Sequence, residues 1–198
     1  NNGADDEIPA PAAAFIEQPR EKPFLLVTSF VNPHNICEWA RGDELKDGAV
    51  GTPPPPEECP PAVENLGPPD GEADGMLLMR RSYQNNRLFP VGDFDRNTWR
   101  QYRWAYFRMI EKVDAHLGTI LAALRESGQL DKTLIVFTAD HGDAQGAHGW
   151  NQKTIFYDNV ARVPFVIVGP GATQGGLSDR LVNTGTDLLP TLCGFAGI

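Results

Sequence analysis

Three short, continuously apolar runs constrain the fold of this 198-residue chain more than any other feature. They read PFLLVTSF at residues 23–30, TLIVFTAD at 133–140 and VPFVIVGPG at 163–171. Runs that do not alternate with polar residues, and that stop near Pro, Gly or Asp, are typical of strands buried on both faces of a parallel sheet. We therefore interpret all three as strands of one sheet.

A helical pattern fills much of the sequence between the first two runs. From Asn97 to Arg125, apolar residues recur at steps of three and four, namely Tyr106, Ile110, Val113, Leu117, Ile120, Leu121 and Leu124. This spacing predicts one helix with a single apolar face. Asn97 or Thr98 is a suitable residue to cap its start, and Gly128 lies just past its end.

The remaining segments complete the predicted architecture. Residues 1–22 are polar and rich in Ala and Pro, which indicates a loop that leads into a short amphipathic piece. Residues 42–75 are rich in Pro, Gly and acids without an apolar period, so we expect an irregular segment there. The sequence TDLLPTLCGFAGI predicts a short closing helix capped by Thr186 or Asp187. Strands that alternate with helices in this way indicate an α/β fold with a mostly parallel sheet flanked by helices.

The composition narrows the classes of partner. Lys and Arg total 17 against 26 Asp and Glu, a formal net charge of −9, which disfavours nucleic acid because phosphate binding needs a basic face. No apolar run approaches the ~20 residues of a membrane helix, so we predict no membrane partner. Cys37, Cys59 and Cys193 form neither a CxxC pair nor a spacing typical of zinc sites. Because the first residue is Asn1 and not Met, we expect a processed product or a fragment.

Reactive side chains follow directly after two of the predicted strands. Asp140 and His141 come at the end of TLIVFTAD, and His34 follows PFLLVTSF within NPHN. Functional residues of parallel α/β sheets gather beyond the carboxyl ends of the strands, so these side chains are expected to share one crevice. There, His34 could act as an acid, a base or a hydrogen-bond donor to a substrate oxygen.

The Asp140-His141 pair suits a divalent cation. A carboxylate oxygen and a neutral imidazole nitrogen can reach one ion from a single turn, and Gly142 keeps that turn narrow. In the alternative interpretation, Asp140 caps a following turn and His141 packs at its edge. The residue pattern alone leaves both interpretations open.

The segment GAHGWNQK places two more reactive side chains close behind this pair. Gly146 and Gly149 indicate an exposed, mobile loop, in which Lys153 offers three donors and a positive charge to an anionic group. His148 lies in the same loop. Viewed alone, the two side chains fit a solvated lysine and a surface histidine better than a binding site.

Three segments together resemble a known family. They are KPFLLVTSFVNPHN, TLIVFTADHGDAQGAHGWNQKTIFYDNVARVPFVIVGPG and VNTGTDLLPTLCGFAGI. Their order and spacing are similar to the carboxyl-terminal half of the sulfatase catalytic domain, within the alkaline-phosphatase-like superfamily. The resemblance implies that residues 1–198 form a single but incomplete sulfatase domain, in which 42–75 is an insertion.

The resemblance also implies an activity and a role for each candidate residue. It implies a sulfuric ester hydrolase of type I, in which a formylglycine hydrate attacks sulfur while Ca²⁺ and basic side chains hold the sulfate. Asp140 and His141 resemble metal ligands, and Lys153 resembles the lysine on the sulfate oxygens. His34 resembles the histidine near the leaving oxygen, and His148 matches a recurrent motif histidine. The implied partner is a sulfate ester, small molecule or glycan, of a periplasmic or secreted protein.

Two parts of the family pattern are missing from these 198 residues. The nucleophile motif is C/S-x-P-x-R, whereas residues 59–63 read CPPAV and residues 37–41 read CEWAR. The first pair of metal ligands is a consecutive acid pair after a strand, and no strand precedes Asp5-Asp6. We therefore expect the nucleophile and the first ligand pair in an amino-terminal part of the domain outside this chain, and an isolated chain without activity.

Two other functions remain open from the sequence. Phosphodiesterases, phosphonate hydrolases and phosphomutases of the same superfamily also carry Asp-His-Gly after a strand. His148, Lys153 and the segment ARVPFVIVGPG favour a sulfatase over them. The second alternative is a non-catalytic binding domain that keeps the fold, which the missing nucleophile permits.

Overall fold

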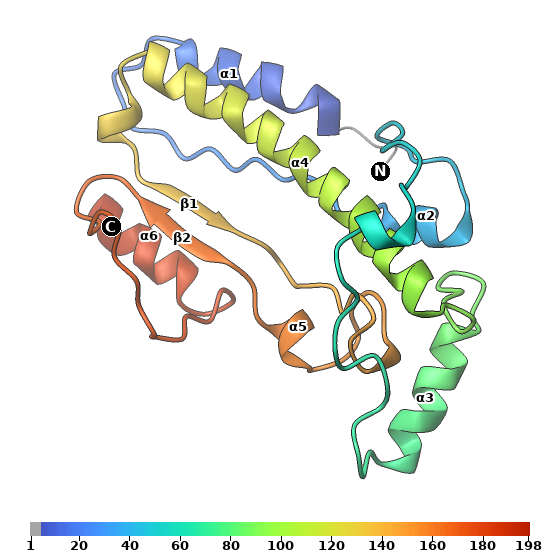
Figure 1. The fold of residues 1–198 in the computed structure, drawn as a ribbon. Coiled ribbons are helices and arrows are strands. Elements are labelled where there is room, and N and C mark those ends of the chain that lie inside the picture. The colour runs from blue at the N-terminus through green and yellow to red at the C-terminus, as the bar shows by residue number, and fades with distance from the viewer. Residues whose placement is uncertain (1–4) are drawn as a thin grey trace.

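The computed structural model describes residues 5–198 (Figure 1). Its helices are α1 (Pro9–Glu17), α2 (Ile36–Arg41), α3 (Asp74–Gln84), α4 (Arg96–Glu126), α5 (Asp158–Ala161) and α6 (Leu188–Ala196). Its strands are β1 (Ile135–Thr138) and β2 (Phe165–Val168). Four single-turn 3₁₀ helices complete the chain, η1 (Asp5–Glu7), η2 (Pro56–Glu58), η3 (Leu130–Lys132) and η4 (Ala147–Gly149). The first four residues of the loop expected over 1–22 lie outside the described part.

Helix α4 is the longest element and confirms the helix predicted from Asn97 to Arg125. Its cap differs from the prediction, because the Asp95 carboxylate accepts a hydrogen bond from the Thr98 backbone N–H at 2.7 Å. Asp95 still has an extended backbone, as a capping residue requires, whereas Asn97 and Thr98 already lie inside the helix. Gly128 follows the helix with a φ of +68°, a left-handed conformation that glycine adopts without strain.

Two apolar clusters pack on α4, one at each end. Near its start lie Ile36, Ala62, Val91, Trp99, Tyr102, Ala105 and Met109. Near its end lie Ala12, Ile16, Ile120, Ala123 and Leu124, where the Ala-rich α1 packs beside α4 (Figure 1). The run 23–30 passes between α4 and β1, with Phe24, Leu26 and Phe30 turned toward this second cluster.

The sheet is smaller than predicted. Strands β1 and β2 confirm two of the three apolar runs and pair antiparallel, from Ile135 opposite Val168 to Thr138 opposite Phe165. Within residues 5–198 there is no parallel ladder, so the mostly parallel sheet is not shown here. The run 23–30 is not a hydrogen-bonded strand, and the described sheet consists of β1 and β2.

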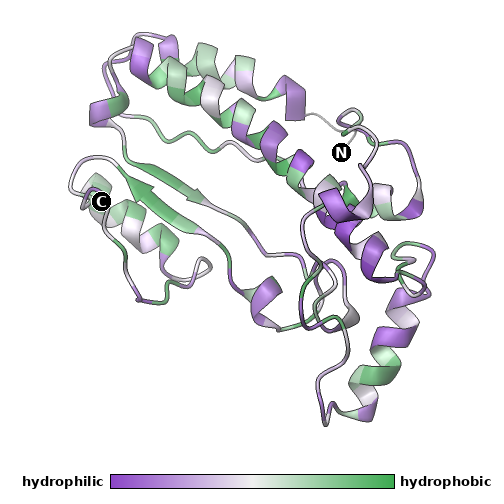
Figure 2. Ribbon diagram, viewed as in Figure 1, coloured by the Kyte–Doolittle hydropathy of each residue, from purple (hydrophilic) through white to green (hydrophobic). Residues whose placement is uncertain are grey.

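One face of these apolar runs is uncovered. In 23–30 the side chains alternate, so that Leu25 and Val27 are 73% and 76% exposed while their neighbours pack inward. Val166 and Val168 of β2 are likewise exposed, and Figure 2 shows β1 and β2 as a continuous apolar area. The sequence prediction of burial on both faces is therefore wrong for the described part of the chain.

The segment 42–75 is mostly irregular and is held by side chains of α4. The Arg100 guanidinium donates hydrogen bonds to the carbonyls of Glu57 and Cys59, at 3.1 and 2.7 Å. The regular structure in this segment consists of η2 and the first two residues of α3. Among residues 5–198, no helix is both long and apolar enough to cross a membrane.

Candidate active site

The loop that follows β1 is organised around a buried carboxylate, Asp143. Its oxygens accept hydrogen bonds from the backbone N–H groups of Gln145 and Gln152, at 2.8 and 3.1 Å. The Tyr102 hydroxyl of α4 donates to the same carboxylate at 3.3 Å. Burial raises the pKa of Asp143 to about 6, and the two backbone hydrogen bonds oppose this rise. Sequence reasoning did not select this residue, which nevertheless fixes the loop that carries Asp140, His141 and Lys153.

The two ring nitrogens of His141 have different partners. Its Nδ1 lies 2.8 Å from the Gly142 carbonyl oxygen, which can only accept, so Nδ1 carries the hydrogen and Nε2 presents a lone pair. Nε2 lies 3.5 Å from Asp140 Oδ2, and the Asp140 side chain is 87% exposed. Two donors at this separation can bind the same divalent cation.

Lys153, at the other end of the loop, contacts His141. Its Nζ lies 2.8 Å from His141 Nε2 and donates a hydrogen bond to that lone pair. The loop thus brings a carboxylate, an imidazole and an ammonium group together, although Lys153 is twelve residues beyond His141. Such a group of side chains can hold a cation and an anion next to each other.

Gly142 allows the loop to pass close to the start of α5. A Cβ atom at this position would lie 2.1 Å from the Asn159 carbonyl oxygen. The Gly142 N–H donates a hydrogen bond to the Val160 carbonyl at 2.8 Å. The glycine is therefore required by close backbone approach, in agreement with the narrow turn predicted after His141.

His34, on a different loop, is affected by the charges of the same group. Partial burial of its ring lowers the pKa of His34, although the residue is largely exposed. The positive charge of Lys153 lowers this pKa further, and Glu38 opposes both effects. His141 and Asp140 also act on this pKa, in opposite directions. The two loops thus lie within electrostatic range of each other, and a neutral His34 imidazole is favoured near neutral pH.

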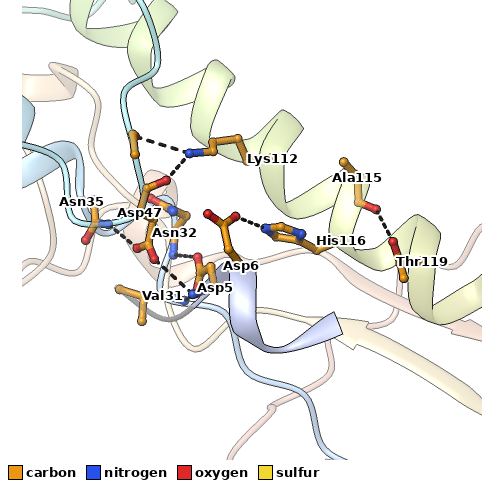
Figure 3. Close-up of polar contacts among 11 residues, drawn as sticks. Asp5, Asp6, Val31, Asn32, Asn35, Asp47, Lys112, Ala115, His116 and Thr119 are labelled. Carbon is orange, nitrogen blue, oxygen red and sulfur yellow. Dashed lines mark hydrogen bonds and ion pairs between the residues drawn. The ribbon is translucent and has the colours of Figure 1, made fainter. Parts of the chain in front are cut away.

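A buried acid holds the His34 loop in place. The Asp5 carboxylate accepts hydrogen bonds from the backbone N–H groups of Val31 and Asn32, at 2.7 and 2.8 Å (Figure 3). The Asp5 N–H donates to Asp47, which also accepts a 2.6 Å hydrogen bond from the Asn35 amide. Asp5 therefore has a positioning role, which its place in a consecutive acid pair did not indicate.

His148 makes its contacts on another side of the loop. Its ring Nε2 lies 3.1 Å from the Asn65 amide nitrogen, and its ring stands 4.3 Å from the ring of Tyr157. Its backbone N–H donates to the Asn65 carbonyl, and Arg80 of α3 donates to its own carbonyl at 3.1 Å. These contacts join η4 to α3 and to the segment 42–75.

The match to known proteins covers the complete chain. The family model described as Sulfatase matches residues 1–198. The chain belongs to the sulfatase family. Members of this family generally use a divalent metal ion.

Individual relatives of this sulfatase-family chain agree with the match. A Delta 4,5-hexuronate-2-O-sulfatase of Bacteroides thetaiotaomicron is 31% identical over 190 residues, which cover 94% of this chain and 39% of that protein. The solved structure of a 2-O GAG sulfatase superposes with a TM-score of 0.83 at 28% identity, covering 98% of this chain and 42% of that one. A phosphonate monoester hydrolase of Agrobacterium radiobacter gives a TM-score of 0.62 at 26% identity, covering 98% and 38%.

The aligned share of this chain and the aligned share of each relative show how much of the fold is present. Nearly all of this chain aligns, whereas it spans about two-fifths of the length of the first two relatives. The 198 residues therefore have part of the alkaline-phosphatase-like sulfatase fold.

Proposed function

We propose that this chain forms one side of a sulfatase active site. In this proposal Lys153 and His34 contact the sulfate ester, and Asp140 and His141 contribute ligands to a divalent cation, Ca²⁺. The observation that carries the proposal is the hydrogen bond between Lys153 and His141, next to the exposed Asp140 carboxylate and within electrostatic range of His34. The sulfatase-family membership of the chain supports the assignment of these groups to a sulfate ester.

The donor set of the Asp140-His141 pair fits a cation that is shared with other ligands. Asp140 Oδ2 and His141 Nε2 are close enough to bind one ion, but two ligands fall short of the six or more that Ca²⁺ takes. When bound, the cation neutralises charge on the sulfate group. The remaining ligands are proposed to come from a part of the protein outside these 198 residues.

Lys153 is proposed to exchange its partner when the site is loaded. The single lone pair of His141 Nε2 can serve either the Lys153 ammonium or a cation. In the loaded protein Lys153 therefore needs another acceptor, and a sulfate oxygen offers one. His34, with its pKa lowered, can donate one neutral N–H to an oxygen of the ester.

The uncovered apolar face supports the proposal that the site is completed from outside. Leu25, Val27 and Val168 are more than half exposed on the runs that border the β1-β2 sheet. Large exposed apolar areas mark surfaces that another part of a protein covers. The motif C/S-x-P-x-R is absent from the sequence, so the nucleophile is proposed to lie in that covering part.

Sulfated sugars are the proposed substrate class. The names of two relatives, a Delta 4,5-hexuronate-2-O-sulfatase and a 2-O GAG sulfatase, state that those proteins act on such compounds. Phosphonate monoester hydrolysis is the second candidate, because a hydrolase of that kind shares the fold at 26% identity. The family model described as Sulfatase, which matches residues 1–198, favours the sulfatase.

The proposal predicts a difference between the isolated chain and the full-length protein encoded by the same gene. The full-length protein is expected to release sulfate from an aryl sulfate in the presence of Ca²⁺, whereas residues 1–198 alone are expected to give no turnover. The measurement is the release of the aryl alcohol at matched protein concentrations. Turnover by residues 1–198 alone would contradict the proposed division of the site, and an inactive full-length protein would contradict the sulfatase assignment.

A further inference from the structure

A second group of metal-binding side chains lies beside the proposed active site. The ligand atoms of His34, Cys37 and Glu38 all lie within 4.8 Å of one another. The three residues are spaced i, i+3 and i+4, which places their side chains on one face of a helical turn. This turn is formed by hydrogen bonds from the Cys37 N–H to the His34 carbonyl and from the Glu38 N–H to the Asn35 carbonyl, at 3.2 and 3.1 Å.

The backbone that carries this group is fixed on both sides. Upstream, Asp5 holds the N–H groups of Val31 and Asn32, and Asp47 holds the side chain of Asn35 (Figure 3). Downstream, α2 continues to Arg41. The three side chains are therefore presented by a rigid turn, which favours metal binding because little ordering is needed.

Two of the three ligands have an unused binding atom. Cys37 is a free cysteine that is 3% exposed. Glu38 uses Oε1 for an ion pair with Arg41 at 3.1 Å, whereas its Oε2 is buried and has no hydrogen-bond partner among the described residues. A buried carboxylate oxygen without a partner is unfavourable, and a bound cation would satisfy it.

The ligand types point to Zn²⁺ and not to Ca²⁺. Thiolate, imidazole and carboxylate are the three ligand classes of protein zinc sites, whereas Ca²⁺ takes oxygen ligands. Tetrahedral ligands of zinc lie on the order of 3.5 Å apart, given Zn–S and Zn–N lengths of about 2.3 and 2.0 Å. The exposed side chain of His34 can close the remaining gap by rotation.

We propose that His34, Cys37 and Glu38 form a zinc site, with water as the fourth ligand, that switches the neighbouring sulfatase site off. On binding, the Cys37 thiol releases its proton to solvent and the thiolate takes the metal. A zinc-bound His34 imidazole is withdrawn from the substrate, so the metal inhibits turnover. The proposed binding of zinc is argued from the geometry of the three side chains alone. The proposed inhibition rests on the role of His34 in the proposed function.

Cobalt binding to the full-length protein tests the site without any need for activity. Co²⁺ occupies zinc sites, and a thiolate ligand gives it a near-ultraviolet charge-transfer band. With Ca²⁺ present throughout, titration with CoCl₂ is expected to produce this band in the parent protein and in Cys59→Ser. The band is expected to be absent in Cys37→Ser, and His34→Ala is expected to weaken cobalt binding by about 10- to 100-fold.

Cys59 is a matched control because it is buried like Cys37, yet its sulfur lies near the Pro54 carbonyl in the proline-rich segment. Circular dichroism of each variant verifies folding, and His34→Ala, an exposed position, keeps the test decisive if Cys37→Ser does not fold. A band that persists in Cys37→Ser, or no band in the parent protein, would overturn the proposed site.

Inhibition of aryl sulfate turnover by ZnCl₂ tests the regulatory part. The parent protein and Cys59→Ser are expected to lose activity as zinc is added, and Cys37→Ser is expected to resist. Equal zinc inhibition of parent and Cys37→Ser would overturn the switch. An inactive parent that still shows the cobalt band would instead contradict the sulfatase proposal and leave the metal site standing, so the two failures are distinguishable.

Discussion

Replacement of Lys153 by alanine is expected to lower kcat/KM of the full-length protein for an aryl sulfate by about 10²- to 10³-fold. The Lys153 ammonium donates a hydrogen bond to His141 Nε2 at 2.8 Å, and the same nitrogen lies 3.5 Å from an Asp140 carboxylate oxygen. A sulfate oxygen is proposed to take the place of His141 as the acceptor for this ammonium group. Loss of a donor aimed at developing negative charge removes transition-state stabilisation that water replaces poorly. The measurement is steady-state kinetics with a chromogenic aryl sulfate.

Two further variants make the Lys153 result specific. Lys132→Ala removes an exposed lysine of η3 and is expected to leave kcat/KM unchanged. Lys153→Arg keeps the charge but changes the donor geometry, so a partial recovery is expected. If Lys153→Ala turned over the ester as fast as the parent protein, Lys153 would have no place in the site.

Replacement of Asp143 by alanine is expected to lower the free energy of unfolding by about 3–5 kcal/mol, since each buried donor left without a partner costs about 1–3 kcal/mol. The N–H groups of Gln145 and Gln152 and the Tyr102 hydroxyl all donate to this carboxylate. The substitution leaves these three donors without their acceptor. The measurement is denaturant unfolding of the full-length protein, with amide hydrogen exchange at Gln145 and Gln152 as a local probe.

Two control variants show whether the loss of stability depends on the buried position of Asp143 and on its charge. Asp131→Ala removes an exposed carboxylate of η3 and is expected to change stability little. Asp143→Asn keeps one acceptor oxygen but places an amide donor against the second backbone N–H, so an intermediate loss is expected. Unchanged exchange at Gln145 and Gln152 in Asp143→Ala would show that the carboxylate does not organise the loop.

The long helix shows which signals a sequence carries well. The apolar period from Asn97 to Arg125 was sufficient to predict α4, because one face of a helix must pack on a core whatever the core contains. The cap was misplaced by two residues or more. Asp95 lies before the apolar period begins, and only the chain path that brings its carboxylate to Thr98 identifies it.

The strands show what the sequence leaves out. An apolar run predicts an extended segment, and this prediction is confirmed for β1 and β2, whereas the burial predicted for both faces is not observed. The same run contains no information on the direction of its partner strand, and the observed pair is antiparallel. For residues 23–30 the run was continuous, yet only alternate side chains are covered within the described residues.

The site shows the same division between local pattern and tertiary arrangement. Asp140, His141 and Lys153 could be selected because acids, imidazoles and amines after a strand are unusual locally, and their roles remain proposals. Asp143 could not be selected, because only the Gln145 N–H is a local donor, whereas the other two donors come from Gln152 and from Tyr102 of α4. The zinc proposal has a similar origin, since Cys37 has no second cysteine nearby in sequence and its partners are His34 and Glu38.

A direct comparison of sulfate and phosphorus esters tests the central claim most directly. The measurement is kcat/KM of the full-length protein, loaded with Ca²⁺, for an aryl sulfate and for the matched aryl phosphate and phosphonate esters. If Lys153, His34 and the Asp140-His141 cation serve a sulfate ester, the sulfate is expected to be preferred by about tenfold or more. A preference for the phosphate or the phosphonate would contradict the sulfatase assignment of this site.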